Sequence, residues 1–435
     1  MSQEQPRYHL RKMLQRRPGK ILAIIIGNVK LQRQFDDKAS GDRTVQEIER
    51  KRGKSMSEIY LDNSATTRPY PQVTDKVVQM LTEKYGNPSS LHHLGVESKL
   101  EVQIARQSIA DALGAAPDEI YFTSGGTESD NLAITGACSA NSRHGNRIVT
   151  TVAEHAAVTK TIRNLKRQGW AVEYIPAPGG RLDLAALKNA IDEQTVLVSV
   201  MMVNNETGCL FPINEVRRIM SQNSSPALLH CDAVQGFGKL PFTAAGTGAD
   251  LISISAHKTH GVKGVGALYV KNGTKVYPIM FGGGQEKGLR SGTESSPLIA
   301  AFGEAARITF ANLHKNILRM TELRDYCLEA ITDQLPRAII NSNKQGAPHI
   351  VNFSLPGIHN EKIVHFLDGK GIYISSGAAC KSNHTRGPSV LESLGLSRAL
   401  ADSALRVSFS PMNTAGDIDQ FIKALVEYCS GNVKS

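Results

Sequence analysis

Two charged side chains stand at the ends of apolar runs that are predicted to be buried strands. Asp232 lies in HCDAVQ (230–235), and Lys258 lies in SISAHKTHG (253–261). In α/β proteins, ligands bind at the carboxyl ends of parallel strands. Pyridoxal 5'-phosphate (PLP) chemistry requires two such residues, an aspartate that pairs with the pyridinium nitrogen and a lysine that forms the imine. Taken singly, Asp232 also fits a helix cap or a loop ion pair, and Lys258 also fits a solvated charge.

A phosphate-binding turn is indicated by SGGTESDN (124–131), which follows a predicted strand and opens a predicted helix. Glycines let a ligand approach the backbone, and the free N–H groups of a helix start favour an anion. Thr127 would add a hydroxyl, and Ser255 and His257 would add further phosphate ligands beside the lysine. The alternative is a simple capping turn.

A second anion site is suggested by the glycine-rich sequence GGGQEKGLRSGTES (282–295), which contains Arg290 and Thr293. Successive backbone N–H groups in such loops form anion-binding concavities. A flexible linker is the alternative interpretation of the same composition.

Cys380 is the candidate nucleophile, because it lies in the small, polar sequence ISSGAACKSN (374–383) and not in an apolar run. The cationic residues Lys381, His384 and Arg386 follow closely and would raise its thiolate fraction. A merely exposed thiol is the alternative. Arg406 is an isolated cation inside an apolar strand, where a substrate carboxylate would suit its planar guanidinium.

Alternating strands and helices from residue 59 onward would position these side chains. Continuous apolar runs between helices are typical of a mostly parallel sheet that is buried on both faces, which predicts α/β architecture. The predicted strands cover residues 59–61, 120–122, 147–151, 196–203, 228–231, 251–255, 349–354, 372–376 and 405–408. The predicted helices cover residues 96–113 (ended by Gly114), 158–168, 296–335 and 415–428.

The positive charge is concentrated in a leader and is not spread over the chain. Residues 1–56 hold 14 of the 50 lysines and arginines and 6 of the 40 acidic residues, and the remaining chain has a net charge of only +2. This distribution argues against direct nucleic-acid binding. We interpret residues 1–55 either as a disordered basic tail or as a segment upstream of a natural start at Met56. The apolar run at 21–26 is too short to cross a bilayer, so no membrane association is predicted.

The six cysteines show neither a CxxC pair nor regular spacing. We therefore expect no disulfide framework, no metal site and a cytoplasmic location.

Nine motifs in order resemble the cysteine desulfurases of the NifS/IscS-like branch, which belong to the class V aminotransferases. The resemblance covers about residues 59–428. The motifs are YLDNSATT (60–67), YGNPSS (85–90), SGGTESDNLAI (124–134), TVAEHAAV (151–158), VNNETG (203–208), HCDAVQ (230–235), SISAHKTHG (253–261), GGGQEKGLRSGT (282–293) and SSGAAC (375–380).

The resemblance implies a role for each matching residue. Lys258 would form the imine with PLP, Asp232 would hold the pyridinium nitrogen, and Gln235 would donate to the phenolic oxygen. His155 would stack on the ring and is a candidate proton shuttle. The implied phosphate ligands are Gly126, Thr127, Ser255, His257 and, from the second subunit of a homodimer, Thr293. Asn205 and Arg406 would bind the substrate carboxylate, and Cys380 would accept the sulfur.

The implied fold is PLP fold type I, as in aspartate aminotransferase. A large domain would span 68–312, and a small α/β domain would combine 56–67 with 313–435. The implied reaction converts L-cysteine to L-alanine and leaves a persulfide on Cys380, for transfer to an iron–sulfur scaffold or a tRNA-thiolating enzyme. The alternatives are another reaction of this fold type, namely selenocysteine lysis or aminotransfer, and a non-enzymatic RNA-binding or scaffold protein.

Overall fold

The computed structural model describes residues 58–377 and 389–432. All of these residues belong to one structural unit, Glu58–Ser435. The predicted leader (1–55) and Cys380 lie outside the described residues.

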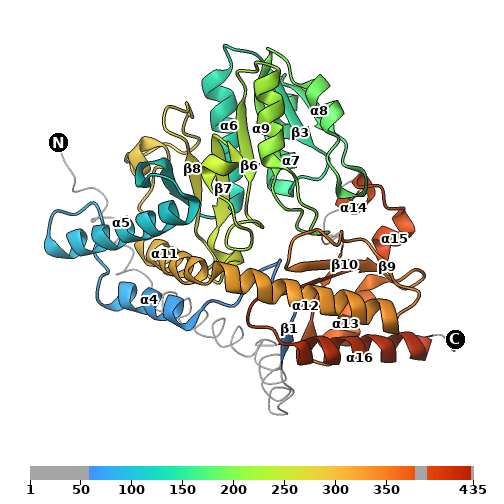
Figure 1. The fold of residues 1–435 in the computed structure, drawn as a ribbon. Coiled ribbons are helices and arrows are strands. Elements are labelled where there is room, and N and C mark those ends of the chain that lie inside the picture. The colour runs from blue at the N-terminus through green and yellow to red at the C-terminus, as the bar shows by residue number, and fades with distance from the viewer. Residues whose placement is uncertain (1–57, 378–388, 433–435) are drawn as a thin grey trace, which may run out of the picture. The chain divides into compact units, whose positions relative to one another are not determined.

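A seven-stranded sheet forms the centre of the larger layered part of the chain (Figure 1). The strands in spatial order are β2 (Ile120–Thr123), β8 (Gly266–Val270), β7 (Leu251–Ser255), β6 (Leu228–Asp232), β5 (Thr195–Met201), β3 (Arg147–Thr151) and β4 (Ala171–Ile175). The neighbours from β7 to β4 pair in parallel, whereas β8 runs antiparallel to both β7 and β2. The predicted mostly parallel sheet is confirmed.

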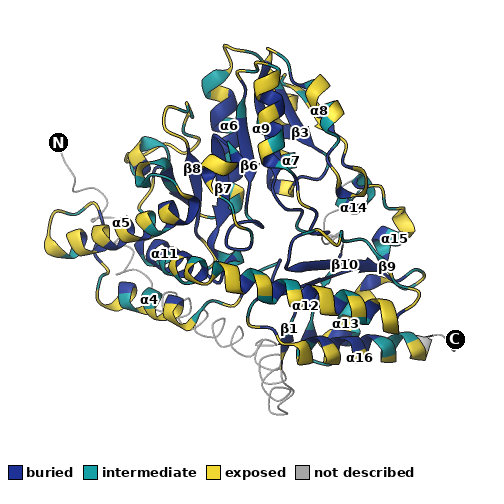
Figure 2. Ribbon diagram, in the orientation of Figure 1, coloured by how far each residue is buried: buried dark blue, intermediate teal, exposed yellow. Residues whose placement is uncertain are grey.

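Both faces of this sheet are buried, as its continuous apolar sequences require. Leu197 and Val198 are consecutive in β5, yet they pack in two different hydrophobic clusters. The cluster on one face includes residues of α6 (Gly126–Asn141) and α7 (Ala156–Arg167). The cluster on the other face includes residues of α5 (His93–Leu113), α8 (Leu184–Ala190), α9 (Ile213–Gln222) and α11 (Ser296–Ala311). Figure 2 shows the strands buried and the outer helix surfaces exposed.

A separate hydrophobic cluster draws its members from residues 59–61 and 323–425. It includes residues of the parallel pair β1 (Ile59–Tyr60) and β11 (Ile372–Tyr373). It also includes residues of β13 (Ala404–Ser408) and β10 (Ile350–Ser354), which lie in an antiparallel sheet in the order β12 (Ser375–Ser376), β13, β10 and β9 (Ile339–Ile340). It also includes helices α12 (Leu313–Gln334), α13 (Asn360–Asp368) and α16 (Ala415–Asn432). β1, the first strand of the described chain, therefore packs in a layer whose other members come mostly from residues 323–425.

Two predicted elements are divided in the structure. The helix predicted for 296–335 is two helices, because Asn312 at the junction has φ −118 and ψ 13. The strand predicted for 372–376 is split at Ile374 into β11 and β12, which pair with different partners.

The remaining helices are α4 (Pro71–Thr82), α10 (Ala244–Thr247), α14 (Val390–Ser393) and α15 (Arg398–Asp402). Among the described residues, no helix combines the length and the apolar character needed to cross a bilayer.

Candidate active site

A cavity of about 320 Å³ lies where the parallel strands of the large sheet end. Ten of the residues predicted from the sequence line it: Gly126, Thr127, His155, Asn205, Asp232, Gln235, Ser255, His257, Lys258 and Arg406. Six lining residues were not predicted: Ser64, Ala65, Asp130, Met201, Val203 and Val234. Thr293 is exposed and is not among the lining residues, and Cys380 lies outside the described residues.

Strand ends bring the aspartate and the lysine to the same edge of the sheet. β6 ends at Asp232, and β7 ends at Ser255, from which a single 3-10 turn leads to Lys258. Because β6 and β7 are parallel neighbours, their carboxyl ends lie side by side. Asp232 and Lys258 therefore lie at the edge of the sheet where the sequence analysis expected them.

The start of α6, which we call the phosphate cradle, lies at the cavity and leaves no room for a side chain at Gly126. A Cβ atom on Gly126 would come within 2.7 Å of Val234 Cγ2, so the helix start has no room for a side chain there. Ser255 Oγ is buried at the same cavity and has no hydrogen-bond partner in the structure. A buried hydroxyl without a partner is costly unless a ligand supplies one. These two features fit the phosphate of PLP.

The Lys258 ammonium group is held by backbone carbonyl groups of an early turn. Its Nζ donates to the carbonyl oxygens of Ser64 at 2.5 Å and Ala65 at 2.7 Å. Burial, together with the charge of Arg406, lowers the pKa of Lys258 to about 8, although Asp62 and Asp232 oppose this shift. The amine is therefore closer to its neutral, reactive form at physiological pH than an ordinary lysine.

Asp232 lies in a buried carboxylate pair. Burial raises the pKa of Asp232, while the nearby His155 and Lys258 lower it, and its Oδ1 accepts from the Val234 N–H at 3.0 Å. Burial, and secondarily the charge of Asp232, raises the pKa of Asp130 well above its usual value. Ligating atoms of Asp130, His155 and Asp232 lie within 4.8 Å of one another. A protonated pyridine nitrogen would give this buried negative charge a partner.

Gln235 is oriented by two buried side chains, Lys239 and His349, that the sequence interpretation missed. Its Oε1 accepts from Lys239 Nζ at 3.2 Å and lies 3.3 Å from His349 Nε2, and its Nε2 donates to the Ser64 carbonyl oxygen at 2.9 Å. Because the amide oxygen faces these donors, the amide nitrogen is the atom left with a hydrogen to offer a ligand. Burial lowers the pKa of Lys239 well below its usual value.

Two histidines at the cavity are held in place through their Nδ1 atoms. His155 caps α7, with its Nδ1 accepting from the Ala157 N–H at 3.2 Å. Desolvation lowers the pKa of His155, although Asp232 opposes the shift. His257 Nδ1 lies 3.2 Å from Thr66 Oγ1, and burial together with Lys258 lowers the pKa of His257 to about 4. His257 is therefore neutral at physiological pH.

The loop that carries Thr293 is anchored to the cradle. Arg290 Nε donates to Glu128 Oε1 at 2.7 Å, and Glu128 Oε2 accepts from the Ser124 N–H at 2.7 Å. Glu286 in the same loop pairs with Arg106 at 2.7 Å. Thr293 is thus presented on an anchored loop, where it is exposed and does not line the cavity.

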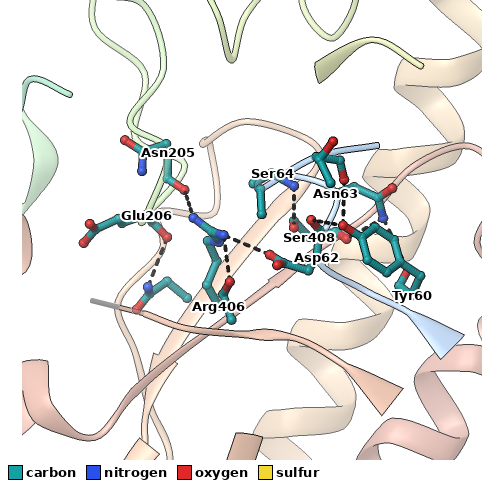
Figure 3. Close-up of polar contacts among 12 residues, drawn as sticks. Tyr60, Asp62, Asn63, Ser64, Asn205, Glu206, Arg406 and Ser408 are labelled. Carbon is teal, nitrogen blue, oxygen red and sulfur yellow. Dashed lines mark hydrogen bonds and ion pairs between the residues drawn. The ribbon is translucent and has the colours of Figure 1, made fainter. Parts of the chain in front are cut away.

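Arg406 and Asn205 also line the cavity. Arg406 Nη1 donates to the Asn205 carbonyl oxygen at 2.9 Å, and the guanidinium Nε is buried without a hydrogen-bond partner (Figure 3). The cavity thus combines a phosphate cradle, an amine with a lowered pKa, a buried carboxylate and a guanidinium with a free donor. This set suits an amino-acid substrate bound beside PLP.

Comparison with known proteins gives one consistent result. Residues 59–421 match the family described as Aminotransferase class-V. The chain is 39% identical over 372 residues to the cysteine desulfurase IscS of Clostridium botulinum (strain Hall), a match that covers 85% of this chain and 93% of that protein. The cysteine desulfurase IscS of Methanosarcina thermophila is 39% identical over 371 residues, covering 85% and 91%. A solved structure titled "NIFS-LIKE PROTEIN" superposes with a TM-score of 0.81 at 36% identity, covering 86% of this chain and 99% of that one.

Proposed function

Because the chain belongs to the class-V aminotransferase family and, within it, to the cysteine desulfurases, we propose that it moves the sulfur of L-cysteine onto Cys380 and releases L-alanine. The observation that carries the proposal is the placement of Lys258, Asp232, Asn205 and Arg406 around one cavity. Family membership implies dependence on PLP.

The residues that would hold PLP are those that the family resemblance assigns to the cofactor and that line the cavity. Gly126, Thr127, Ser255 and His257 would receive the phosphate, and Lys258 would hold the cofactor covalently. Asp232 would bind the ring nitrogen, Gln235 would donate its amide hydrogen to the phenolic oxygen, and His155 would cover the ring. When bound, PLP supplies an electron sink for negative charge at the substrate Cα.

Lys258 would be the base that removes the proton from the substrate. Its amine would take the proton from the substrate Cα, because a pKa of about 8 leaves part of the group neutral near physiological pH. The carbonyl oxygens of Ser64 and Ala65 would hold the resulting ammonium group. His155 is a candidate for a second proton transfer, because its lowered pKa leaves it neutral.

The sulfur step would form one bond and break one. The Cys380 thiolate would attack the substrate sulfur, the S–S bond would form, and the Cβ–S bond would break with its electron pair retained on the substrate. Protonation of the substrate carbons then gives alanine, so that cysteine and the enzyme thiol become alanine and the enzyme persulfide. The sulfur would pass to an acceptor protein, an iron–sulfur scaffold or a tRNA-thiolating enzyme.

A homodimer is part of the proposal, and an exposed apolar stripe supports it. Val96, Leu100 and Ile104 follow one another at helical spacing on α5 and are exposed by 55%, 54% and 51% of their surface. A contiguous apolar helix face of this kind usually marks an interface. In a dimer, Thr293 would reach the phosphate of the other subunit, which agrees with its position outside its own cavity.

We also propose the division into a large domain (68–312) and a small domain (56–67 with 313–435). The hydrophobic cluster formed by residues 59–61 and 323–425 supports it.

The test is incubation with L-cysteine, with alanine and protein-bound persulfide measured together. Wild type should form both. Lys258→Ala should lose the visible absorbance of the bound cofactor, whereas Cys380→Ala should keep that absorbance and form neither product, because loss of a covalent nucleophile removes the acceptor. Alanine formation at the wild-type rate by Cys380→Ala would refute the role of Cys380.

A further inference from the structure

Asp62 does not line the cavity, yet its carboxylate contacts the guanidinium that does. Arg406 Nη2 donates to Asp62 Oδ1 at 2.9 Å and to Ser375 Oγ at 3.0 Å, and Nη1 donates to the Asn205 carbonyl oxygen (Figure 3). The Arg406 and Asp62 side chains are only 10% and 18% exposed. The pair is therefore largely shielded from water, where a charge-assisted hydrogen bond is stronger than at the surface.

These contacts leave Arg406 with donors for a ligand. A guanidinium has five N–H groups, and the three contacts occupy one on Nη1 and two on Nη2. The Nε–H is buried without a hydrogen-bond partner. An arginine side chain has many rotamers, so the acceptors behind it decide where its remaining donors point.

The backbone at Asp62 is fixed independently of this ion pair. Asp62 forms a parallel bridge with Ser408, whose N–H donates to the Leu61 carbonyl oxygen at 2.7 Å. On the other side, Ser64 N–H donates to Ser408 Oγ at 2.8 Å, and Asn63 Nδ2 donates to the Ser408 carbonyl oxygen at 2.9 Å. Since Ser408 and Arg406 belong to the same strand, β13, these contacts place the Asp62 carboxylate beside Arg406. Replacement of the carboxylate should therefore leave the turn in place.

We propose that Asp62 is a positioning residue that holds Arg406 so that its free N–H donors face the carboxylate of the amino-acid substrate. This inference rests on the proposed function, in which Arg406 binds that carboxylate. Asp62 would act mainly on substrate affinity, because its carboxylate contacts Arg406 and no residue of the phosphate cradle, whereas Lys258 senses only its charge.

The test compares two probes on the PLP-loaded protein. 3-Mercaptopropionate carries the carboxylate and thiol of cysteine without the amine, and cysteine methyl ester lacks the negative charge. Asp62→Asn should weaken 3-mercaptopropionate binding and raise the KM for cysteine about tenfold, the usual effect of losing one hydrogen bond to a charged group. Its affinity for the ester should stay close to that of wild type. Because the Asp62 charge also raises the pKa of Lys258, the pH profile of kcat should shift to lower pH while its maximum stays close to that of wild type.

Controls separate positioning from a general structural effect. Asp75→Asn, on the exposed side of α4, should change neither probe. In an Arg406→Lys background, Asp62→Asn should add little, because the guanidinium through which it acts is gone. If Asp62→Asn is insoluble, Asp62→Ser keeps a small polar group at the turn and serves in its place.

An unchanged affinity for 3-mercaptopropionate in Asp62→Asn would overturn the proposal, and so would an equal loss of affinity for both probes. Failure of the proposed function is a different result, because wild type would then release no alanine from cysteine while the binding comparison could still be made.

Discussion

Replacement of Gly126 by alanine should weaken PLP binding through one steric contact. Gly126 is the first residue of α6 and has no positive φ, so its backbone tolerates alanine. The added Cβ, however, would lie 2.7 Å from Val234 Cγ2, well inside the ordinary contact distance of about 3.5–4.0 Å. Valine has a stiff χ1, so Val234 cannot swing away freely. The helix start, which supplies the N–H groups of the phosphate cradle, must shift instead.

The size of the effect follows from the overpacking. An extra methyl group in a packed site typically costs about 1–3 kcal/mol. If that cost falls on the cradle, the dissociation constant for PLP should rise by roughly 5- to 150-fold, since about 1.4 kcal/mol is tenfold. Val234→Ala removes the clashing methyl group, so Gly126→Ala/Val234→Ala should recover most of the affinity.

The assay is PLP titration of the apoprotein followed by absorbance. Gly416→Ala is the matched control, because a Cβ there meets only Thr414 Oγ1 at 3.7 Å, and it should bind PLP normally. The steric reasoning is refuted if Gly126→Ala binds PLP as wild type does, or if removing the Val234 methyl groups gives no recovery.

Three further changes test other parts of the site. Asp232→Asn should keep PLP but lose most alanine production, because a neutral amide no longer keeps the pyridine nitrogen protonated; near-normal turnover would assign that nitrogen to another residue. The rate of PLP capture by the apoprotein, measured by stopped-flow absorbance, should rise with pH through about 8 and then level off, because the Lys258 amine reacts only when neutral and its pKa is lowered to about 8. A flat pH profile would show that the lysine titrates elsewhere. Deletion of residues 1–55 should leave thermal stability and alanine production unchanged, and a large loss of either would show that the leader contributes to folding.

The strand-end residues could be predicted because their geometry follows from sequence order. Asp232 and Lys258 each close a continuous apolar run, and parallel strands place such ends at one edge. β8 was not among the predicted strands, and its antiparallel direction could not be predicted either, because an apolar run does not encode whether its neighbours are parallel. The break at Ile374 likewise depends on which partner strand is near.

Residues that act behind the cavity could not be found from local sequence. Lys239 lies four residues after Gln235, a spacing that many solvated lysines share, and its burial depends on packing around the whole pocket. Asp62 and Arg406 are 344 residues apart, so only the fold brings them together. The motif YLDNSATT marked the segment as similar to a family but gave no physical reason for its carboxylate.

The placement of β1 beside β11 has a consequence for biosynthesis. The turn at Ser64 and Ala65 holds the lysine, yet it is fixed by Ser408, so one wall of the cavity is the contact between an early segment and a late one. The ribosome synthesises the early segment first, so the turn at Ser64 and Ala65 cannot be fixed until β13 has been made. Contacts of such large sequence separation also form slowly. A nascent chain that already displays the phosphate cradle would therefore still lack the fixed turn that contacts Lys258, and this wall of the cavity would be completed only after β13 has been made.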